Sequence, residues 1–189
     1  LCGTTLASIP ARLPYIRASA DRVAIWRDRL REAQPQPTRR IGVVWHGNVA
    51  HENDAERSLP DLATLRSLAA LAGVQLVSLQ HGEPDAATRR TLHEMQMLDL
   101  GACLGDFHET AAIVSCLDLV ISVDTSTAHL AGALGCPVWV LLPHWLTDWR
   151  WLTGRSDSPW YPGAMRLFRQ PDSGQWLPVV QDVLQALAA

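Results

Sequence analysis

The sequence of 189 residues contains no lysine, so all sixteen of its basic side chains are arginines. This excludes a lysine Schiff base and the lysine of a P-loop nucleotide site. Two other signatures are absent as well: no G-x-G-x-x-G run follows the first predicted strand, and no G-x-S-x-G elbow occurs. A nicotinamide or flavin Rossmann enzyme and a P-loop NTPase are therefore disfavoured.

Cysteine is scarce and scattered, with four residues and no C-x-x-C pair. The seven histidines show no H-E-x-x-H spacing. Cys116 and Cys136 lie in apolar stretches and are predicted to be buried, reduced thiols, which suits a cytoplasmic protein. We therefore expect a cytoplasmic chain with no metal ion and no cofactor.

Long apolar runs are also absent, since none approaches the roughly 20 residues that cross a bilayer. A net charge of −3 argues against a nucleic-acid partner. The charge is uneven: residues 1–40 carry eight arginines and three carboxylates, whereas residues 41–189 carry eight and sixteen. The first forty residues fit a solvated helix and linker or, alternatively, a basic docking face for an upstream domain. Because the chain begins with Leu1, we expect further sequence before it.

The N-terminal region is predicted to contain one helix. Val23, Trp26 and Leu30 recur at helical spacing, which predicts a helix over residues 21–33. The proline-rich segment 34–37 then ends this helix. We therefore predict an N-terminal helix and linker over residues 1–37 and a main domain over residues 38–189.

In the main domain, short continuous apolar runs alternate with helical segments. The predicted strands cover residues 41–45, 74–79, 97–100, 119–123, 138–142 and 165–169. The predicted helices cover residues 62–71, 85–95, 109–116, 126–134 and 176–188, with a tryptophan-rich loop over 148–162. This alternation is typical of the α/β class, with a Rossmann-like parallel sheet and helices on both faces.

The most informative polar residues follow the predicted strand 119–123. Asp124 ends this strand, and Thr125, Ser126 and Thr127 begin the next helix. We expect one hydroxyl to cap the helix, and the others to bind an anion together with free backbone amides. His129 lies one turn further along, where it can donate to a phosphate oxygen. The alternative is an ordinary helix cap followed by a packed histidine.

Two other strand ends also carry polar residues. Gly47 and Asn48 follow the first strand, and Gly47 permits either close backbone approach or a positive φ. Arg57 can bind a phosphate as a bidentate donor. After the second strand, Gln80 can read the edge of a base and Glu83 can accept from ribose hydroxyls. Ligands of open α/β sheets bind beyond the carboxyl ends of the strands, so we expect these residues to share one site.

Several stretches carry a family likeness: GVVWHGN (42–48), DAERS (54–58), VSLQHG (77–82) and LDLVISVDTSTAHLAGALGCP (117–137), extended by DWRW (148–151), SPWYP (158–162) and RLFRQ (166–170). They resemble the family 9 glycosyltransferases, the heptosyltransferase group. The likeness is greater to bacterial proteins that carry tetratricopeptide repeats ahead of such a domain. It covers nearly everything after residue 40.

The resemblance implies the C-terminal half of a two-domain GT-B glycosyltransferase, which binds an ADP- or UDP-linked nucleoside diphosphate sugar. It implies metal-independent, inverting transfer, with the acceptor site and catalytic base in an N-terminal domain outside this chain. That domain, or tetratricopeptide repeats, would be its partner. Two departures occur: Ser126 stands where heptosyltransferases have glycine after Asp-Thr, and Arg57 where they often have lysine.

The resemblance also implies a role for each candidate residue. The diphosphate would be held by Arg57, Thr125, Ser126, Thr127 and His129. Gln80 and Glu83 would face the base and the ribose, and Asp124 would contact the sugar or hold the turn.

Two alternatives to a transferase stay open. The first is a non-catalytic nucleotide-binding or protein-interaction module that keeps the fold. The second is a sugar-nucleotide epimerase, which shares the GT-B arrangement. Several of the eight tryptophans lie between Trp139 and Trp160 and suit a domain contact or a partner surface. Core packing suits Trp139 better than Trp149.

Overall fold

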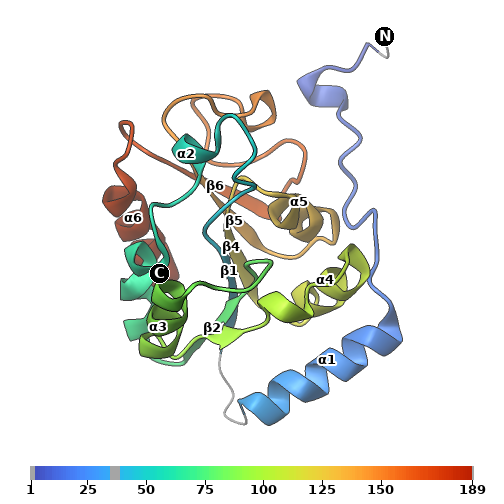
Figure 1. The fold of residues 1–189 in the computed structure, drawn as a ribbon. Coiled ribbons are helices and arrows are strands. Elements are labelled where there is room, and N and C mark those ends of the chain that lie inside the picture. Colours follow the sequence, from blue (N-terminus) through green and yellow to red (C-terminus); the bar gives the residue numbers. More distant parts are fainter. Residues whose placement is uncertain (1–2, 35–38, 189) are drawn as a thin grey trace.

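The computed structural model describes residues 3–34 and 39–188 and contains one parallel six-stranded sheet, with helices on either side of it (Figure 1). The strands lie in the order β3-β2-β1-β4-β5-β6, and every neighbouring pair is parallel. Their bounds are β1 Arg39–Val44, β2 Val74–Ser78, β3 Leu98–Asp99, β4 Leu119–Val123, β5 Val138–Leu142 and β6 Met165–Arg169. The predicted α/β, Rossmann-like fold is confirmed, and the order of strands reverses direction between β1 and β4.

Helices cover both faces of the sheet, and each face has its own apolar core. One face carries α4 (Phe107–Val114) and α5 (Ser126–Ala133), with α1 (Ala20–Ala33) packed outside α4 (Figure 1). The other carries α3 (Ala86–Glu94), α6 (Trp176–Ala188) and the 3₁₀-helix η2 (Leu62–Ala70). Among the described helices, none combines the length and the apolar character that crossing a bilayer requires.

Four short elements were not predicted. One-turn helix α2 (Asp54–Arg57) lies in the connection after β1, and 3₁₀ turns form at η1 (Leu6–Ser8), η3 (Gly101–Cys103) and η4 (Trp149–Trp151). Helix α2 holds Arg57 in place and therefore matters for the site.

The helix predicted over residues 62–71 forms as the 3₁₀-helix η2. Its three buried leucines, Leu62, Leu65 and Leu68, recur every third residue. A 3₁₀-helix has three residues per turn, so this spacing places all three on one buried face. Asp61 caps the helix by accepting a hydrogen bond from the Thr64 amide.

Helix α1 packs one apolar face against the rest of the fold, while most of its other side chains are exposed. Trp26 and Leu30 are only 4% and 2% exposed. The Trp26 indole Nε1 donates to Glu109 Oε2 on α4 over 2.7 Å, and Arg22 forms an ion pair with the same carboxylate. The predicted domain start at Thr38, and most of the predicted linker, lie outside the described residues and stay predictions.

Candidate functional site

A cavity of about 990 Å³ opens beyond the carboxyl ends of β1, β2 and β4. It lies where the strand order reverses, the position at which open α/β sheets bind ligands. Seven of the nine predicted site residues line it: Asn48, Arg57, Gln80, Glu83, Thr125, Ser126 and Thr127. Asp124 and His129 are not among its lining residues.

Helix α5 begins at the edge of this cavity without a side-chain cap. Thr125 occupies the N-cap position, but its Oγ1 hydrogen-bonds Ser122 Oγ over 2.9 Å and not a helix amide. The expectation that a hydroxyl caps this helix is therefore wrong. Within the described residues, the amides of Ser126 and Thr127 have no hydrogen-bond acceptor. Free amides and the helix dipole together attract an anion.

Arg57 lines the cavity beside this helix start and is held in place by two partners. Its Nε lies 3.3 Å from Asp54 Oδ1, and its Nη1 donates to the main-chain oxygen of Asp124 over 3.2 Å. Ser58 Oγ donates to the same Asp54 oxygen and accepts from the Gly47 amide, each over 2.8 Å. Only 14% of the Arg57 side chain is exposed. Asp54 and Ser58 were not predicted as site residues, although both lie with Arg57 in the DAERS stretch.

Gly47 lets the Asp54 and Arg57 side chains approach the backbone closely, and its own backbone conformation does not require glycine. A Cβ at this position would lie 2.5 Å from Asp54 Oδ1 and 2.6 Å from Arg57 Nη2. Its φ is outside the left-handed region. Gly47 therefore makes the room in which the arginine crosses the end of β1.

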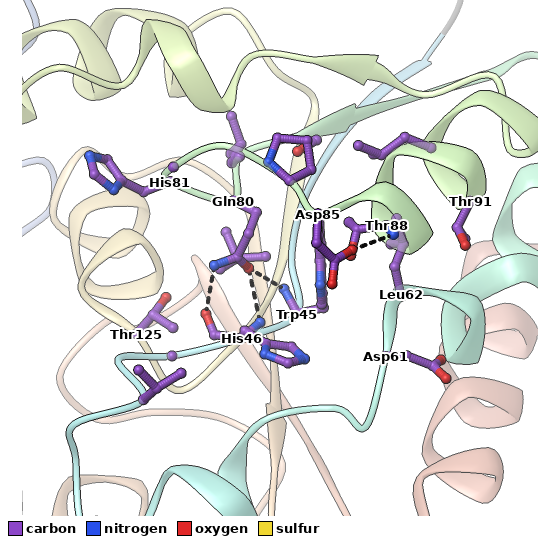
Figure 2. A pocket seen from close by; sticks show the side chains of 18 of the residues that line it. Trp45, His46, Asp61, Leu62, Gln80, His81, Asp85, Thr88, Thr91 and Thr125 are labelled. Carbon is purple, nitrogen blue, oxygen red and sulfur yellow. Dashed lines mark hydrogen bonds between the residues drawn. The ribbon is translucent and has the colours of Figure 1, made fainter.

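The side chain of Gln80 extends the pairing of β1 beyond the strand (Figure 2). Its Oε1 accepts from the amides of Trp45 and His46 over 3.3 and 3.0 Å, and its Nε2 donates to the His46 carbonyl over 3.2 Å. These bonds position the loop that carries Gly47 and Asn48. Recognition of a base by Gln80 stays a prediction.

The other two predicted site residues at the cavity, Asn48 and Glu83, are exposed. Asn48 Oδ1 accepts from the Ala50 amide over 3.0 Å, which forms a local turn. The Glu83 side chain is 81% exposed and forms an ion pair with Arg89 at 3.8 Å. Both side chains are free to turn toward a ligand, and their predicted contacts stay predictions.

Polar groups also line the part of the cavity between η2 and α3 (Figure 2). Asp85 caps α3 by accepting from the Thr88 amide over 2.7 Å, and this bond lowers the pKa of its carboxyl group. Asp61, Thr91 and His46 line the cavity as well. Within the described residues, no group of three or more histidine, cysteine or acidic side chains is arranged to hold a metal ion.

Asp124 and His129 lie on the other side of the start of α5, where the connection from β5 to β6 packs. His129 Nε2 is 3.7 Å from Asp124 Oδ1, and its Nδ1 is 2.9 Å from the Tyr161 hydroxyl. Trp151 stacks on the imidazole with ring centroids 5.0 Å apart. Burial lowers the pKa of His129, opposed in part by Asp124. The structure thus brings His129 beside Asp124 and not into the cavity.

The remaining sequence predictions concern thiols and tryptophans. Cys116 and Cys136 are free and half-buried, and burial raises the pKa of both thiols. Trp139 packs against the core, whereas Trp149 is 63% exposed, as the sequence predicts.

No family model matches the chain. Protein FlbA of Caulobacter vibrioides is 28% identical over an alignment of 190 positions, which covers 97% of this chain and 30% of that protein. Similar solved structures include two glycosyltransferases. E. coli ADP-heptose LPS heptosyltransferase II has a TM-score of 0.56 and 14% identity, over 97% of this chain and 57% of that one. A family 9 glycosyl transferase from Veillonella parvula has a TM-score of 0.63 and 13% identity. This match covers 92% of this chain and 52% of the Veillonella chain.

These similarities establish the fold. The chain has the Rossmann-like α/β architecture found in GT-B glycosyltransferases of the family 9 type. It spans about half the length of these two structures and 30% of FlbA.

Proposed function

We propose that this chain is the donor-binding domain of a GT-B glycosyltransferase and binds an ADP- or UDP-linked nucleoside diphosphate sugar. The observation that carries the proposal is the start of α5. Free amides of Ser126 and Thr127 and the guanidinium of Arg57 meet there at the rim of a cavity of about 990 Å³. An anion site joined to a cleft of this size suits a phosphorylated nucleoside.

The two sides of α5 suggest how the donor would lie. The nucleoside would occupy the cavity between η2 and α3, within reach of Gln80 and Glu83. The diphosphate would lie on the α5 amides beside Arg57. The sugar would then project toward Asp124 and His129. Fixed amides and a held guanidinium would stabilise the charge that develops on the departing nucleoside diphosphate.

The fold shared with two glycosyltransferases supports this assignment, and it also suggests what the chain needs for activity. Both structures are about twice as long as the part that matches. An N-terminal domain, or tetratricopeptide repeats, would complete the protein and supply the acceptor site and catalytic base. A cytoplasmic setting, where nucleotide sugars are made, would suit this role.

Calorimetric titration with ADP, UDP and GDP, with and without Mg²⁺, tests the proposal. We expect saturable binding of one nucleotide that does not depend on the metal. Arg57→Ala removes a charge-assisted contact of about 1.5–3 kcal/mol and should weaken binding by roughly 10- to 150-fold. Arg31→Ala is the matched control, because Arg31 lies on α1, pairs with Asp28 and is 65% exposed.

Two results would contradict a working donor site. One is the absence of binding by a folded chain at millimolar nucleotide. The other is an equal effect of the two arginine substitutions.

A second candidate, a protein-interaction module, is favoured by the exposed apolar side chains after β5. Trp145 and Trp149 are each 63% exposed, and Leu146 is 56% exposed. Exposed aromatic groups of this size are characteristic of interaction surfaces. A folded chain that binds no nucleotide would favour this candidate over the donor domain.

A further inference from the structure

His129 is surrounded on three sides by groups that fix its orientation. Its Nδ1 lies 2.9 Å from the hydroxyl of Tyr161, a distance that requires one hydrogen between them. Trp151, which is fully buried, stacks on the ring at an interplanar angle of 18°. Nε2 faces Asp124 Oδ1 at 3.7 Å. The imidazole therefore has one defined edge toward Tyr161 and the other toward the carboxylate.

Tyr161 is itself held against α5. A Cβ at Gly132 would lie 2.5 Å from Tyr161 Cδ1, so the phenol ring rests directly on the helix backbone. Tyr161 is 7% exposed, and burial raises the pKa of its hydroxyl far above neutrality. The hydroxyl therefore keeps its proton and can donate it in a hydrogen bond.

The electrostatics decide which atom donates. Burial lowers the pKa of His129, so at neutral pH the ring carries one hydrogen on one of its two nitrogens. A hydrogen on Nε2 faces the negative charge of Asp124, whereas a bare Nε2 would present its lone pair to that charge. With the hydrogen on Nε2, Nδ1 is free to accept from Tyr161.

We propose that Tyr161 is a positioning residue that holds neutral His129 in its Nε2–H tautomer, with this hydrogen turned toward Asp124 at the start of α5. The tautomer follows from the contacts within the chain. Its consequence rests on the proposed function: Nε2–H becomes the donor that meets a phosphate or sugar oxygen of the bound ligand. Tyr161 lies 32 residues beyond His129 in the chain and acts through it.

Nitrogen-15 NMR of the histidine side chains in the full chain tests the tautomer without any ligand. We expect His129, assigned by loss of its signals in His129→Gln, to show an unprotonated Nδ1 and a protonated Nε2. Tyr161→Phe keeps the ring but removes the hydroxyl, and should shift the population toward the Nδ1–H form. Gly132→Ala, which displaces the Tyr161 ring, should act in the same direction if Tyr161→Phe does not fold. A protonated Nδ1 in the wild type, or a tautomer unchanged in the folded variants, would overturn the proposal.

Titration with the nucleotide that binds, ADP or UDP, then tests the consequence. Tyr161→Phe should weaken binding about fivefold, the equivalent of roughly one neutral hydrogen bond. Ser115→Ala is the control, because the Ser115 hydroxyl donates to the Ala111 carbonyl at the end of α4 and Ser115 is not among the residues that line the cavity. If the wild type binds neither nucleotide, the proposed function fails, while the NMR result still decides the tautomer.

Discussion

Arg57 Nη1 donates a hydrogen bond to the main-chain oxygen of Asp124 over 3.2 Å. The two residues follow β1 and β4, which are neighbours at the point where the strand order reverses. The bond therefore ties the two loops that flank the start of α5. It also places the guanidinium beside the helix amides before any ligand arrives, which reduces the entropy lost on binding.

Arg57→Lys should destabilise the protein by about 1–3 kcal/mol, because a lysine ammonium cannot reproduce the planar fork that serves Asp54 and Asp124 together. Urea unfolding followed by circular dichroism measures this. Arg66→Lys is the control, since Arg66 pairs with Glu94 at a site that is 56% exposed. That change should stay within about 0.5 kcal/mol. Equal losses in the two variants would contradict a structural role for the Arg57 fork.

Gly47→Ala should weaken nucleotide binding about tenfold, because the new Cβ would displace the Asp54 carboxylate and the Arg57 guanidinium that it holds. The displaced guanidinium would lose its charge-assisted contact with the phosphate. Gly105→Ala is the matched control, because a Cβ there meets nothing within 4 Å and its φ is outside the left-handed region. Calorimetry on both variants compares the affinities. Unchanged binding in Gly47→Ala would mean that Arg57 reaches the ligand without this close packing.

Leu30→Ala should cost about 2–5 kcal/mol in free energy of unfolding, the usual range for a fully packed leucine. Leu30 is 2% exposed, whereas Ile25 on the same helix is 39% exposed. Ile25→Ala should therefore cost about 1 kcal/mol or less. Thermal or urea unfolding distinguishes the two. Equal, small effects would mean that α1 is only loosely attached and that the domain begins after it.

The sheet was predictable from the sequence because its main strands are short, largely apolar runs bounded by turn residues. A strand covered on both faces needs this pattern and little else. The α5 hydroxyls were found for a similar local reason, since they follow such a strand directly. The three-residue spacing of Leu62, Leu65 and Leu68 was present too, but it also fits one face of an α-helix. Local spacing therefore did not distinguish the two helix types.

The environment of His129 could not be predicted in the same way. Its spacing from Thr125 suggested one shared phosphate site, yet Tyr161 and Trp151 hold it beside Asp124, and it is not among the residues that line the cavity. Likewise the Gln80 side chain accepts hydrogen bonds from the amides of Trp45 and His46, which lie far earlier in the chain. The contacts of His129 and of Gln80 both depend on which distant segments the sheet brings together. The spacing of residues along the chain does not encode this.

Glu109 should make the stability of the protein depend on pH in the acid range. Its carboxylate accepts the Trp26 indole N–H and pairs with Arg22, and these contacts, with the Trp26 bond the largest, lower its pKa from the ordinary value of 4.5. The unfolded chain lacks these contacts, so it takes up the proton at a higher pH. The stabilisation is therefore fully present above about pH 4.5 and is lost as the pH falls through the lower, folded-state pKa.

Glu109→Gln keeps an oxygen that can accept the indole hydrogen but removes the charge. We expect the wild type to be more stable than this variant at pH 7, by a margin that stays constant down to about pH 4.5 and narrows below it. Urea unfolding at a series of pH values measures the margin. In a Trp26→Phe background the indole donor is gone, so the same substitution should have a smaller effect. A margin that does not change with pH would mean that the ion contacts at Glu109 add nothing to the attachment of α1.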